Sequence, residues 1–542
     1  MPSASGNSSN VRDAVTGLSI AGLMLPEGIA YAQIAGLAPG RALIAAVAGG
    51  LAYALIGRSR FAVVSPTSSA AAILAASLAS LPGDAAMRGA AATMLVAIVG
   101  LLFLGFALFR LGSLASFISR PVLHGFAFGL ALTIIIGQLP KVTGVAVPSG
   151  PIWTKLTALA STVPQWHVAS ALLGVGALAA LLALRRLPQL PAALLVILAG
   201  ISLGSFADLH ALGIATAGRV TLELPSFALP ANLPPWTLLV ELAAPIALIL
   251  FAESWGTMRA LALKHGDRIS ANRELGALGA ANLAAAAVQG MPVGAGFSAG
   301  SANEAAGAAS RLSGAVGAMA LLLLALFAGD WIARIPEPIL AAVVIAALTH
   351  ALSPAPFFRL FRIKRDEGTA LAAAAGVLAF GVLDGMLVAV ALSIANLLYD
   401  LSHPSISELG RVGDSHDFVD IARHKEAKAL PGLAIFRPNA PLIFANAESV
   451  LFAIAERALK RDAHCVVLSL EESNDLDSTA ADALGEFTGQ LQKAGRHVIL
   501  ARVHDKVREV LDKDGLDNLA AGSTFSVADA AALAAKESHL WP

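Results

Sequence analysis

Apolar residues dominate nearly every stretch of the chain from Val11 to about Leu401, and short polar or Pro/Gly clusters interrupt them. Gly57-Arg58-Ser59-Arg60 and Leu81-Pro82-Gly83-Asp84 are two of these interruptions. Apolar runs of about 20 residues between polar breaks are typical of membrane-spanning helices. We predict fourteen such segments, near residues 11–34, 40–57, 66–81, 89–110, 121–139, 168–184, 190–206, 236–260, 272–289, 299–310, 312–329, 331–350, 368–383 and 385–402.

The pattern changes after His403-Pro404, where short Val/Ile/Leu runs alternate with amphipathic stretches and charges become frequent. This pattern predicts a cytosolic α/β domain over residues 404–542. Strands are expected at 433–437, 465–470 and 497–501, and helices at 448–460, 479–493 and 505–514. Cys465 would begin a buried strand. Because it is the single cysteine of the chain, an internal disulfide is excluded.

Composition supports a membrane protein, because 56% of the residues are hydrophobic and only 14% are charged. An average soluble protein has roughly a quarter of its residues charged. The formal net charge is zero, with 37 basic and 37 acidic residues, and gives no sign of a nucleic-acid partner. Residues 1–403 carry 22 basic and 16 acidic residues, so the basic excess lies in the membrane region.

Basic residues also predict the orientation, because Lys and Arg gather in short cytoplasmic loops. With the N-terminus inside, 16 of the 22 basic residues before position 404 fall on the cytoplasmic side. We therefore expect a multi-pass protein of the bacterial inner membrane, with a cytosolic N-terminal tail over residues 1–10 and a cytoplasmic C-terminal domain.

The segment 207–235 divides the membrane region into two halves of seven spans, about 11–206 and 236–403. A repeat with an odd number of spans must be inverted in the membrane, and the site then often lies at short, interrupted helices in corresponding positions. The third and tenth spans are such a pair, beginning near Val64-Ser65-Pro66-Thr67 and Pro292-Val293-Gly294. Facing helix N-termini favour an anion. The alternative is that these small residues allow close helix packing.

Ionisable residues inside spans are costly and usually functional. Glu253 lies in the middle of the eighth span, and Thr257 follows one turn later on the same face. Together they could hold a sodium ion, or the carboxyl alone could carry a proton. Glu27 is a second candidate, because Pro26 is expected to break the first span and leave donors for the carboxylate. A structural role in helix packing is the alternative for both acids.

Gly296-Phe297-Ser298-Ala299-Gly300 fits the G-x-S-x-G pattern of hydrolases. That pattern requires a strand before the serine, whereas an Ala-rich helix and a Pro/Gly break are expected here. We therefore predict that the protein is not an enzyme.

The first-span signature of the sulfate permease family, anion transporters related to animal solute carrier family 26, is similar to Leu25-Pro26-Glu27-Gly28-Ile29-Ala30-Tyr31-Ala32. The ninth-span motif of the family is similar to residues 272–282, and the tenth to residues 292–314. The tail resembles the family's STAS domain at Leu430-Pro431-Gly432, at residues 442–448 and at Asp477-Ser478-Thr479.

This resemblance implies a fourteen-span inverted repeat of core and gate domains that moves its site like an elevator, commonly as a homodimer in the lipid bilayer. It also implies an anion site, at Thr67, Ser68, Phe297, Ser298 and Ala299. Many relatives carry arginine where Ala299 stands. Glu253 and Thr257 match the coupling-cation site of sodium-driven members, and Glu27 replaces a usual glutamine.

Related STAS proteins are phosphorylated at a serine in the loop before a helix, which makes Ser478 and Thr479 candidate regulatory residues and suggests a cytosolic partner. The alternative is that Ser478 or Thr479 only caps that helix, with Thr479 and Asp482 as a capping-box-like pair.

These features predict a secondary active transporter of a small anion, bicarbonate, sulfate or a dicarboxylate, by proton or sodium symport. No cofactor is expected beyond the coupling ion. A nucleobase-cation symporter of the same architecture is one alternative, although it usually has no STAS tail. A non-transporting anion sensor or scaffold that acts through the STAS domain is the other.

Overall fold

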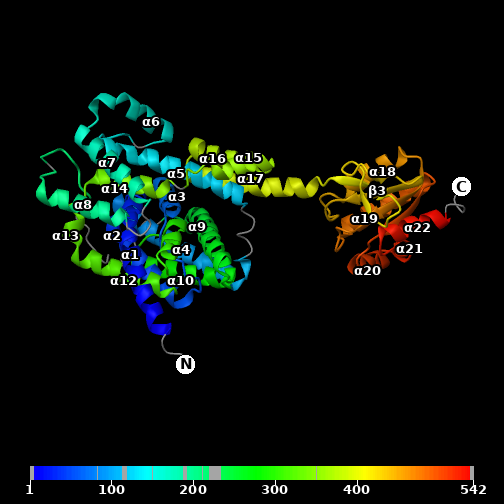
Figure 1. The fold of residues 1–542 in the computed structure, drawn as a ribbon, viewed down its shortest axis with the longest axis horizontal. Coiled ribbons are helices and arrows are strands. Elements are labelled where there is room, and N and C mark those ends of the chain that lie inside the picture. Colours follow the sequence, from blue (N-terminus) through cyan, green and yellow to red (C-terminus); the bar gives the residue numbers. More distant parts are fainter. Residues whose placement is uncertain are drawn as a thin grey trace. The chain divides into compact units, whose positions relative to one another are not determined.

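Each of the fourteen predicted apolar segments contains a helix in the computed structural model (Figure 1). The structure describes residues 5–81, 84–112, 119–148, 150–186, 192–209, 211–218, 234–349 and 351–537. The chain forms two units, Met1–Ile394 and Ala395–Pro542. The segment 207–235 that separates the predicted repeats lies largely outside the described residues.

The first half of the membrane unit contains eight α-helices: α1 (Ser5–Ile34), α2 (Pro39–Ile56), α3 (Ser68–Ala79), α4 (Ala85–Leu108), α5 (Arg120–Thr143), α6 (Ile152–Ser161), α7 (Val168–Leu184) and α8 (Ala192–Phe206) among the residues described there. The second half contains α9 (Trp236–His265), α10 (Ala271–Ala287), α11 (Phe297–Ala305), α12 (Leu312–Phe327), α13 (Gly329–Ile332), α14 (Glu337–Leu348), α15 (Ala355–Ile363), α16 (Glu367–Phe380) and α17 (Val382–Ser402). The predicted N-terminal tail overlaps α1, which begins at Ser5.

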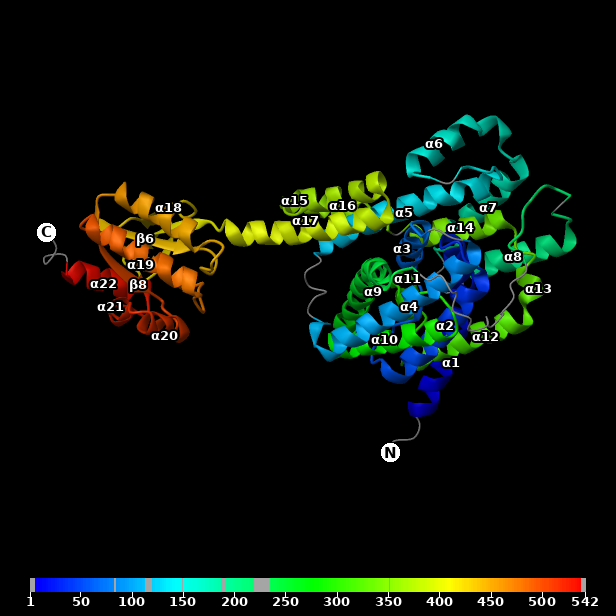
Figure 2. The same cartoon turned by 180° about the vertical axis from the view of Figure 1, so that it is seen from behind.

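These helices pack in two groups (Figure 2). One group contains α1, α2, α4, α9, α10 and α12, and the other contains α5, α7, α14 and α16. Contacts of α1 with α14, and of α3 with α5, join the groups, and α8 contacts α1 as well as α7 and α14. The short helices α3 and α11 pack on α1 and α9 of the first group.

Six helices in the described part of the chain are long and apolar enough to cross a membrane: Asn10–Ile34, Pro39–Ile56, Ala86–Leu108, Arg120–Thr143, Trp236–His265 and Asp384–Ser402. Six further apolar helices are shorter, α3 and α14 among them. An apolar helix of about 20 residues spans the hydrocarbon core by itself. At the ends of a shorter helix, the non-helical backbone must be covered by neighbouring protein or line a cavity.

Three details differ from the predicted helix pattern. The helix α1 continues through Pro26, so the predicted break is wrong; the proline removes one backbone donor, which membrane helices tolerate. The twelfth segment is divided into α13 and α14 before Pro336, where Ala217 N–H donates to Ile335 at 2.8 Å. The helices α6 and α15 were not predicted, because Lys155 and Arg359 interrupt their apolar character.

The second unit contains a mixed sheet in the order β4-β3-β6-β7-β8, with β5 beside β3. The strands are β3 (Ile406–Val412), β4 (Phe418–Asp420), β5 (Ala427–Lys428), β6 (Gly432–Pro438), β7 (Ala463–Ser469) and β8 (His497–Ala501). The strands β6, β7 and β8 are parallel, and β3 is antiparallel to β6. The helices are α18 (Ala447–Leu459), α19 (Ser478–Lys493), α20 (Asp505–Lys513), α21 (Asp517–Ala521) and α22 (Val527–Glu537).

Helices cover both faces of the parallel strands, which explains their continuous apolar runs. Residues of α18 and α19 such as Leu451 and Leu484 pack with Val466 of β7. Ala530 of α22 packs on the other face with Cys465 and Val467. The three predicted strands and three predicted helices are confirmed, and Cys465 is buried as expected.

Candidate anion site

Two short strands bring the starts of the third and tenth predicted spans together. The strands β1 (Val64–Pro66) and β2 (Val293–Ala295) form an antiparallel pair, with Ser65 opposite Gly294. The helix α3 begins directly after β1, and α11 begins directly after β2. Two helix N-termini with their partial positive charges therefore lie at one place, as the sequence predicts.

The two helix starts are capped differently. Thr67 is the N-cap of α3, and its hydroxyl accepts a hydrogen bond from the N–H of Ala70 at 3.3 Å. Gly296 is the N-cap of α11 and supplies no side-chain cap. A Cβ atom at Gly296 would lie 3.6 Å from Thr67 Cγ2 and 3.9 Å from Glu253 Oε1, so this backbone lies beside both side chains. An uncapped helix start next to hydroxyl groups is suited to an anion.

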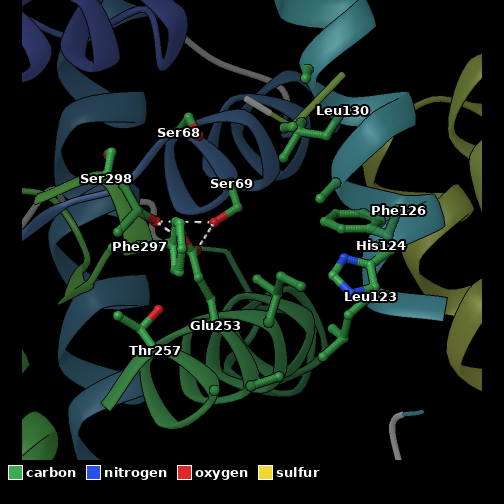
Figure 3. A pocket seen from close by; sticks show the side chains of 18 of the residues that line it. Ser68, Ser69, Leu123, His124, Phe126, Leu130, Glu253, Thr257, Phe297 and Ser298 are labelled. Carbon is green, nitrogen blue, oxygen red and sulfur yellow. Dashed lines mark hydrogen bonds between the residues drawn. The ribbon is translucent and has the colours of Figure 1, made fainter. Parts of the chain in front are cut away.

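A cavity of about 810 Å³ opens at these helix starts (Figure 3). All the residues predicted for the anion and coupling-ion sites line it: Glu27, Thr67, Ser68, Glu253, Thr257, Phe297, Ser298 and Ala299. Ala299, at the position where many relatives are expected to have arginine, is buried. The side chain of Phe297 is half-exposed, and Figure 3 shows it among the side chains that line the cavity.

Glu253 is tied to the start of α3. Its Oε2 atom accepts a hydrogen bond from Thr67 Oγ1 at 3.2 Å and a short one from Ser69 Oγ. The Thr67 and Ser69 hydroxyls also contact each other at 3.0 Å. The carboxylate thus lies against the first turn of α3, where its charge interacts favourably with the helix dipole.

Glu27 is tied to the start of α11. It is 5% exposed, and its Oε1 atom accepts a hydrogen bond from Ser298 Oγ at 3.4 Å. Each short helix therefore presents a hydroxyl that is bonded to one acid, Glu27 being buried and Glu253 half-buried. A carboxylate repels a nearby anion, so an anion placed here would be opposed by each of these acids unless the acid were protonated or paired with a cation.

Thr257 lies in the same cavity but faces α11. A Cβ atom at Gly300 would lie 3.1 Å from Thr257 Cγ2, which places this threonine against the second turn of α11. No hydrogen bond joins Thr257 to Glu253 within the described ranges. The predicted pairing of these two side chains on a cation remains a prediction.

The polar and charged residues of the cavity lining that were not predicted as site residues include Ser69, Arg120, His124 and Arg259. The argument that selected Thr67 and Ser68 applies equally to Ser69, which follows them. Arg120 and His124 lie one turn apart at the start of α5, and Arg259 lies two residues after Thr257 on α9. Arg120 and Arg259 were interpreted only as markers of orientation, although these two arginines also give the cavity a basic wall.

The G-x-S-x-G pattern does follow a strand, so that part of the sequence argument is wrong. The strand β2 ends one residue before Gly296, but it has three residues and pairs antiparallel with β1. Ser298 donates to Glu27, and none of the residues that line this cavity with it forms the histidine-based triad of a hydrolase there.

In the second unit, the helix after residue 477 is capped by a residue other than those predicted. Asp477 is the N-cap of α19, and it accepts the N–H of Ala480 at 2.9 Å. It also accepts the N–H of Phe444 at 2.7 Å. The helix begins at Ser478, so Ser478 and Thr479 lie inside its first turn and the capping prediction is wrong. Ser478 is exposed and Thr479 is half-buried.

Comparisons with known proteins agree with this architecture. The sulfate permease family model matches residues 11–374, and the STAS domain model matches residues 424–531. A probable sulfate transporter of Mycobacterium tuberculosis (strain H37Rv) is 36% identical over 523 residues, covering 94% of this chain and 93% of the relative. Probable sulfate transporter 4.2 of Arabidopsis thaliana is 27% identical and covers 95% of this chain and 79% of its own length.

Solved structures show the same fold. The murine Solute Carrier 26 family member A9 anion transporter, in its inward-facing state, has a TM-score of 0.86 at 20% identity and covers 97% of this chain and 91% of its own. The transmembrane domain of the cyanobacterial bicarbonate transporter BicA has a TM-score of 0.63 at 23% identity, and the match covers 70% of this chain and 97% of that domain. Because the family model spans most of the chain and the M. tuberculosis relative aligns over nearly all of it, this chain belongs to the sulfate permease family, whose members are transporters and not enzymes.

Proposed function

We propose that this chain is a secondary active transporter that carries a small anion through the site between the starts of α3 and α11. The pairing of β1 with β2, which places both helix starts on one cavity, carries the proposal. Backbone N–H groups and the hydroxyls of Thr67, Ser68 and Ser298 would bind the anion. The names of the relatives make sulfate the first candidate and bicarbonate the second, and dicarboxylates are kept as a third.

We also propose that the anion enters with a proton or a sodium ion. Glu27 and Glu253 both line the cavity, and each is bonded to a hydroxyl of a short helix. An anion beside two carboxylates in a poorly solvated cavity is strongly repelled. A proton or sodium ion on the carboxyl at position 253 removes part of that repulsion, so cation and anion bind together more strongly than either binds alone.

Uptake into proteoliposomes tests the anion site. Purified protein is assayed with sulfate, bicarbonate, chloride, fumarate and succinate, with and without sodium and at several pH values. We expect Ser298→Leu to abolish binding and uptake of the transported anion while folding is kept, because the side chain fills the start of α11. Ser301→Leu, on the same helix but outside the cavity lining, is the matched control. Wild-type affinity in Ser298→Leu would remove the site assignment.

Coupling is tested with Glu253→Gln and Glu27→Gln. Glutamine keeps the shape and cannot take up a proton or give a charge to sodium. We expect Glu253→Gln to lose the dependence of uptake on a proton or sodium gradient. Unchanged gradient dependence in this variant would rule out the coupling role. Binding of anions by the wild type without any flux would instead favour a sensor.

We further propose an elevator-like motion between the two groups of helices, a homodimer, and an inner-membrane location with both termini in the cytoplasm. The separate packing of the two groups supports the motion, and the distribution of basic residues supports the orientation, whereas the homodimer rests on the resemblance to the family alone. Cross-linking of paired cysteines in membranes, and reporter fusions at each terminus, test them. Phosphorylation at Ser478 or Thr479 and binding of a cytosolic partner by the STAS domain stay proposals of the same kind.

A further inference from the structure

Within the described part of the chain, the strand β2 has a partner strand on only one side. It pairs with β1, in which Pro66 lies opposite Val293 and has no N–H to give. A three-residue strand of this kind is not stable by itself. Its backbone groups on the other side need partners, because the strand is buried along its whole length.

Asn282 of α10 supplies two of these partners. Its Oδ1 atom accepts the N–H of Val293 at 3.0 Å, and its Nδ2 atom donates to the carbonyl of Val293 at 2.8 Å. The same Nδ2 atom donates to the carbonyl of Leu278 at 2.9 Å, which fixes the amide against its own helix. Asn282 is fully buried and lies outside the cavity lining.

Ser254 of α9 supplies the third partner. Its hydroxyl accepts the N–H of Ala295 at 2.9 Å, and Ser254 is also fully buried. Between the two anchored residues, a Cβ atom at Gly294 would lie 2.5 Å from Leu250 Cδ1 and 2.7 Å from Ser254 Oγ. Only glycine permits β2 to approach α9 so closely.

We infer that Asn282 and Ser254 are positioning residues, which set the anion affinity from outside the cavity by holding β2 and therefore the start of α11. Ser254 is next to Glu253, which bonds to the start of α3. One turn of α9 thus holds both halves of the site at a fixed separation. This inference rests on the anion site proposed above.

The first test compares Ser254→Ala with Ser313→Ala. Both serines are fully buried in the membrane unit, but Ser313 Oγ bonds to the nearby carbonyl of Ser310 and has no contact with β2. We expect Ser254→Ala to raise the KM for anion uptake about three- to tenfold, because a buried N–H loses its acceptor. The maximal rate should change less than twofold, and Ser313→Ala should leave both values near wild type.

The second test uses Asn282→Asp, which has the shape of asparagine but cannot donate to the carbonyls of both Val293 and Leu278, as the amide does. We expect a KM at least tenfold higher. Hydrogen–deuterium exchange of the full-length protein should rise in the peptide covering residues 293–300 and stay unchanged in α12 and α16. Faster exchange throughout the membrane unit, or an unchanged KM in both variants, would overturn the inference.

The exchange measurement does not depend on transport. If the wild type proves not to bind or carry anions, the proposed function fails, while local exchange at residues 293–300 still reports whether Asn282 and Ser254 hold the helix start. If transport is confirmed and exchange in this segment is unchanged in the variants, only the positioning role fails.

Discussion

Ser69 illustrates how single hydroxyl groups define the cavity. It is 5% exposed and donates to Glu253, so it neutralises part of the carboxylate charge without occupying the centre of the cavity. The same helix contains Ser77, which is also buried and whose hydroxyl has no hydrogen-bond partner among the described residues. The two serines lie on the same helix and are both buried, but only Ser69 bonds to Glu253. Ser77 is therefore a matched control for Ser69.

Substitution of Ser69 by alanine should alter cation coupling more than anion binding. With the anion saturating, we expect Ser69→Ala to change the concentration of proton or sodium that gives half-maximal uptake about tenfold, because a hydrogen bond to a charged group is lost. The anion KM should change less than threefold. Ser77→Ala should match wild type in both. Equal effects of the two substitutions would show that Ser69 acts only in packing.

The basic wall of the cavity should affect how fast anions arrive. Arg120 and Arg259 line the cavity, and neither has a side-chain hydrogen-bond or ion-pair partner within the ranges that the structure describes. Unpaired cations at the mouth of a cavity attract anions over several ångströms, and salt screens this attraction.

We therefore expect Arg259→Gln to lower uptake about three- to tenfold at low ionic strength and low anion concentration. The difference from wild type should nearly vanish in high salt of a non-transported ion. Arg268→Gln, an exposed arginine beyond the end of α9 and outside the cavity, is the control. A loss that persists in high salt would indicate a direct contact with the anion instead of attraction at a distance.

At the scale of elements, helices were easier to predict than strands. Apolar runs such as those of α4 and α5 are long enough that composition alone predicts them. The strands β1 and β2 have three residues each and no periodicity, and Pro66 argues against a strand. The sequence could therefore locate both helix starts, through their Ser, Pro and Gly residues, but not the pairing that joins them.

The side chains around the site also divide into those that the local sequence indicates and those that only the packing of distant segments brings to the site. Thr67, Ser68 and Ser298 belong to local breaks that can be recognised in the sequence. Asn282 and Ser254 contact β2 from distant helices, and nothing in an apolar helix distinguishes a buried asparagine that holds another segment. The alternative role of Ser478 or Thr479 as a cap rested on residue type and on the spacing of Thr479 to Asp482, whereas the cap depends on where α19 begins.

The cap of α19 gives a prediction at this scale. Asp477 bonds both the first turn of α19 and the N–H of Phe444, so Asp477→Ala should destabilise the STAS domain by about 1–2 kcal/mol. Ser478→Ala should cost less than about 0.5 kcal/mol, because its exposed side chain lies past the cap. Hydrogen exchange of α19 amides in the full-length protein measures both. Equal protection in the two variants would contradict this assignment.

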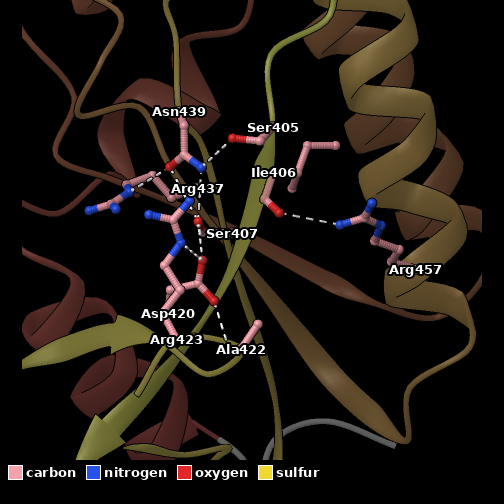
Figure 4. A network of polar contacts seen from close by, with 9 residues as sticks. All are labelled: Ser405, Ile406, Ser407, Asp420, Ala422, Arg423, Arg437, Asn439 and Arg457. Carbon is pink, nitrogen blue, oxygen red and sulfur yellow. Dashed lines mark hydrogen bonds and ion pairs between the residues drawn. The ribbon is translucent and has the colours of Figure 1, made fainter. Parts of the chain in front are cut away.

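At the scale of the whole molecule, the zero net charge is the sum of a basic membrane region and an acidic C-terminal region. Acids in the two regions have different surroundings. Glu27 and Glu253 bond to hydroxyls in a cavity of the membrane unit, whereas Asp420 lies in a polar network of the STAS sheet (Figure 4). The network joins β3, β4 and the end of β6, since Ser407 also contacts Asn439.

Asp420 should make the STAS domain sensitive to acid. A hydrogen bond from Ser407 Oγ at 2.7 Å, one from the N–H of Ala422 at 2.8 Å and the charges of Arg423 and Arg437 lower the pKa of Asp420 below its ordinary value. The ordinary value of an aspartate in an unfolded chain is about 3.9. A lowered pKa in the folded state stabilises the fold at pH values above about 4, and this contribution disappears as the pH falls through the folded value.

The stability of the STAS domain should therefore fall between pH 5 and pH 3. Hydrogen exchange of its amides in the full-length protein measures this stability. Asp420→Asn should be less stable than wild type at pH 7 by about 1 kcal/mol and should depend less on pH in this interval, because the amide cannot take up a proton. Asp482→Asn, an exposed position on α19, should follow the wild-type curve. If wild type and Asp420→Asn lost stability in parallel down to pH 3, the acid sensitivity would have to arise from other carboxylates.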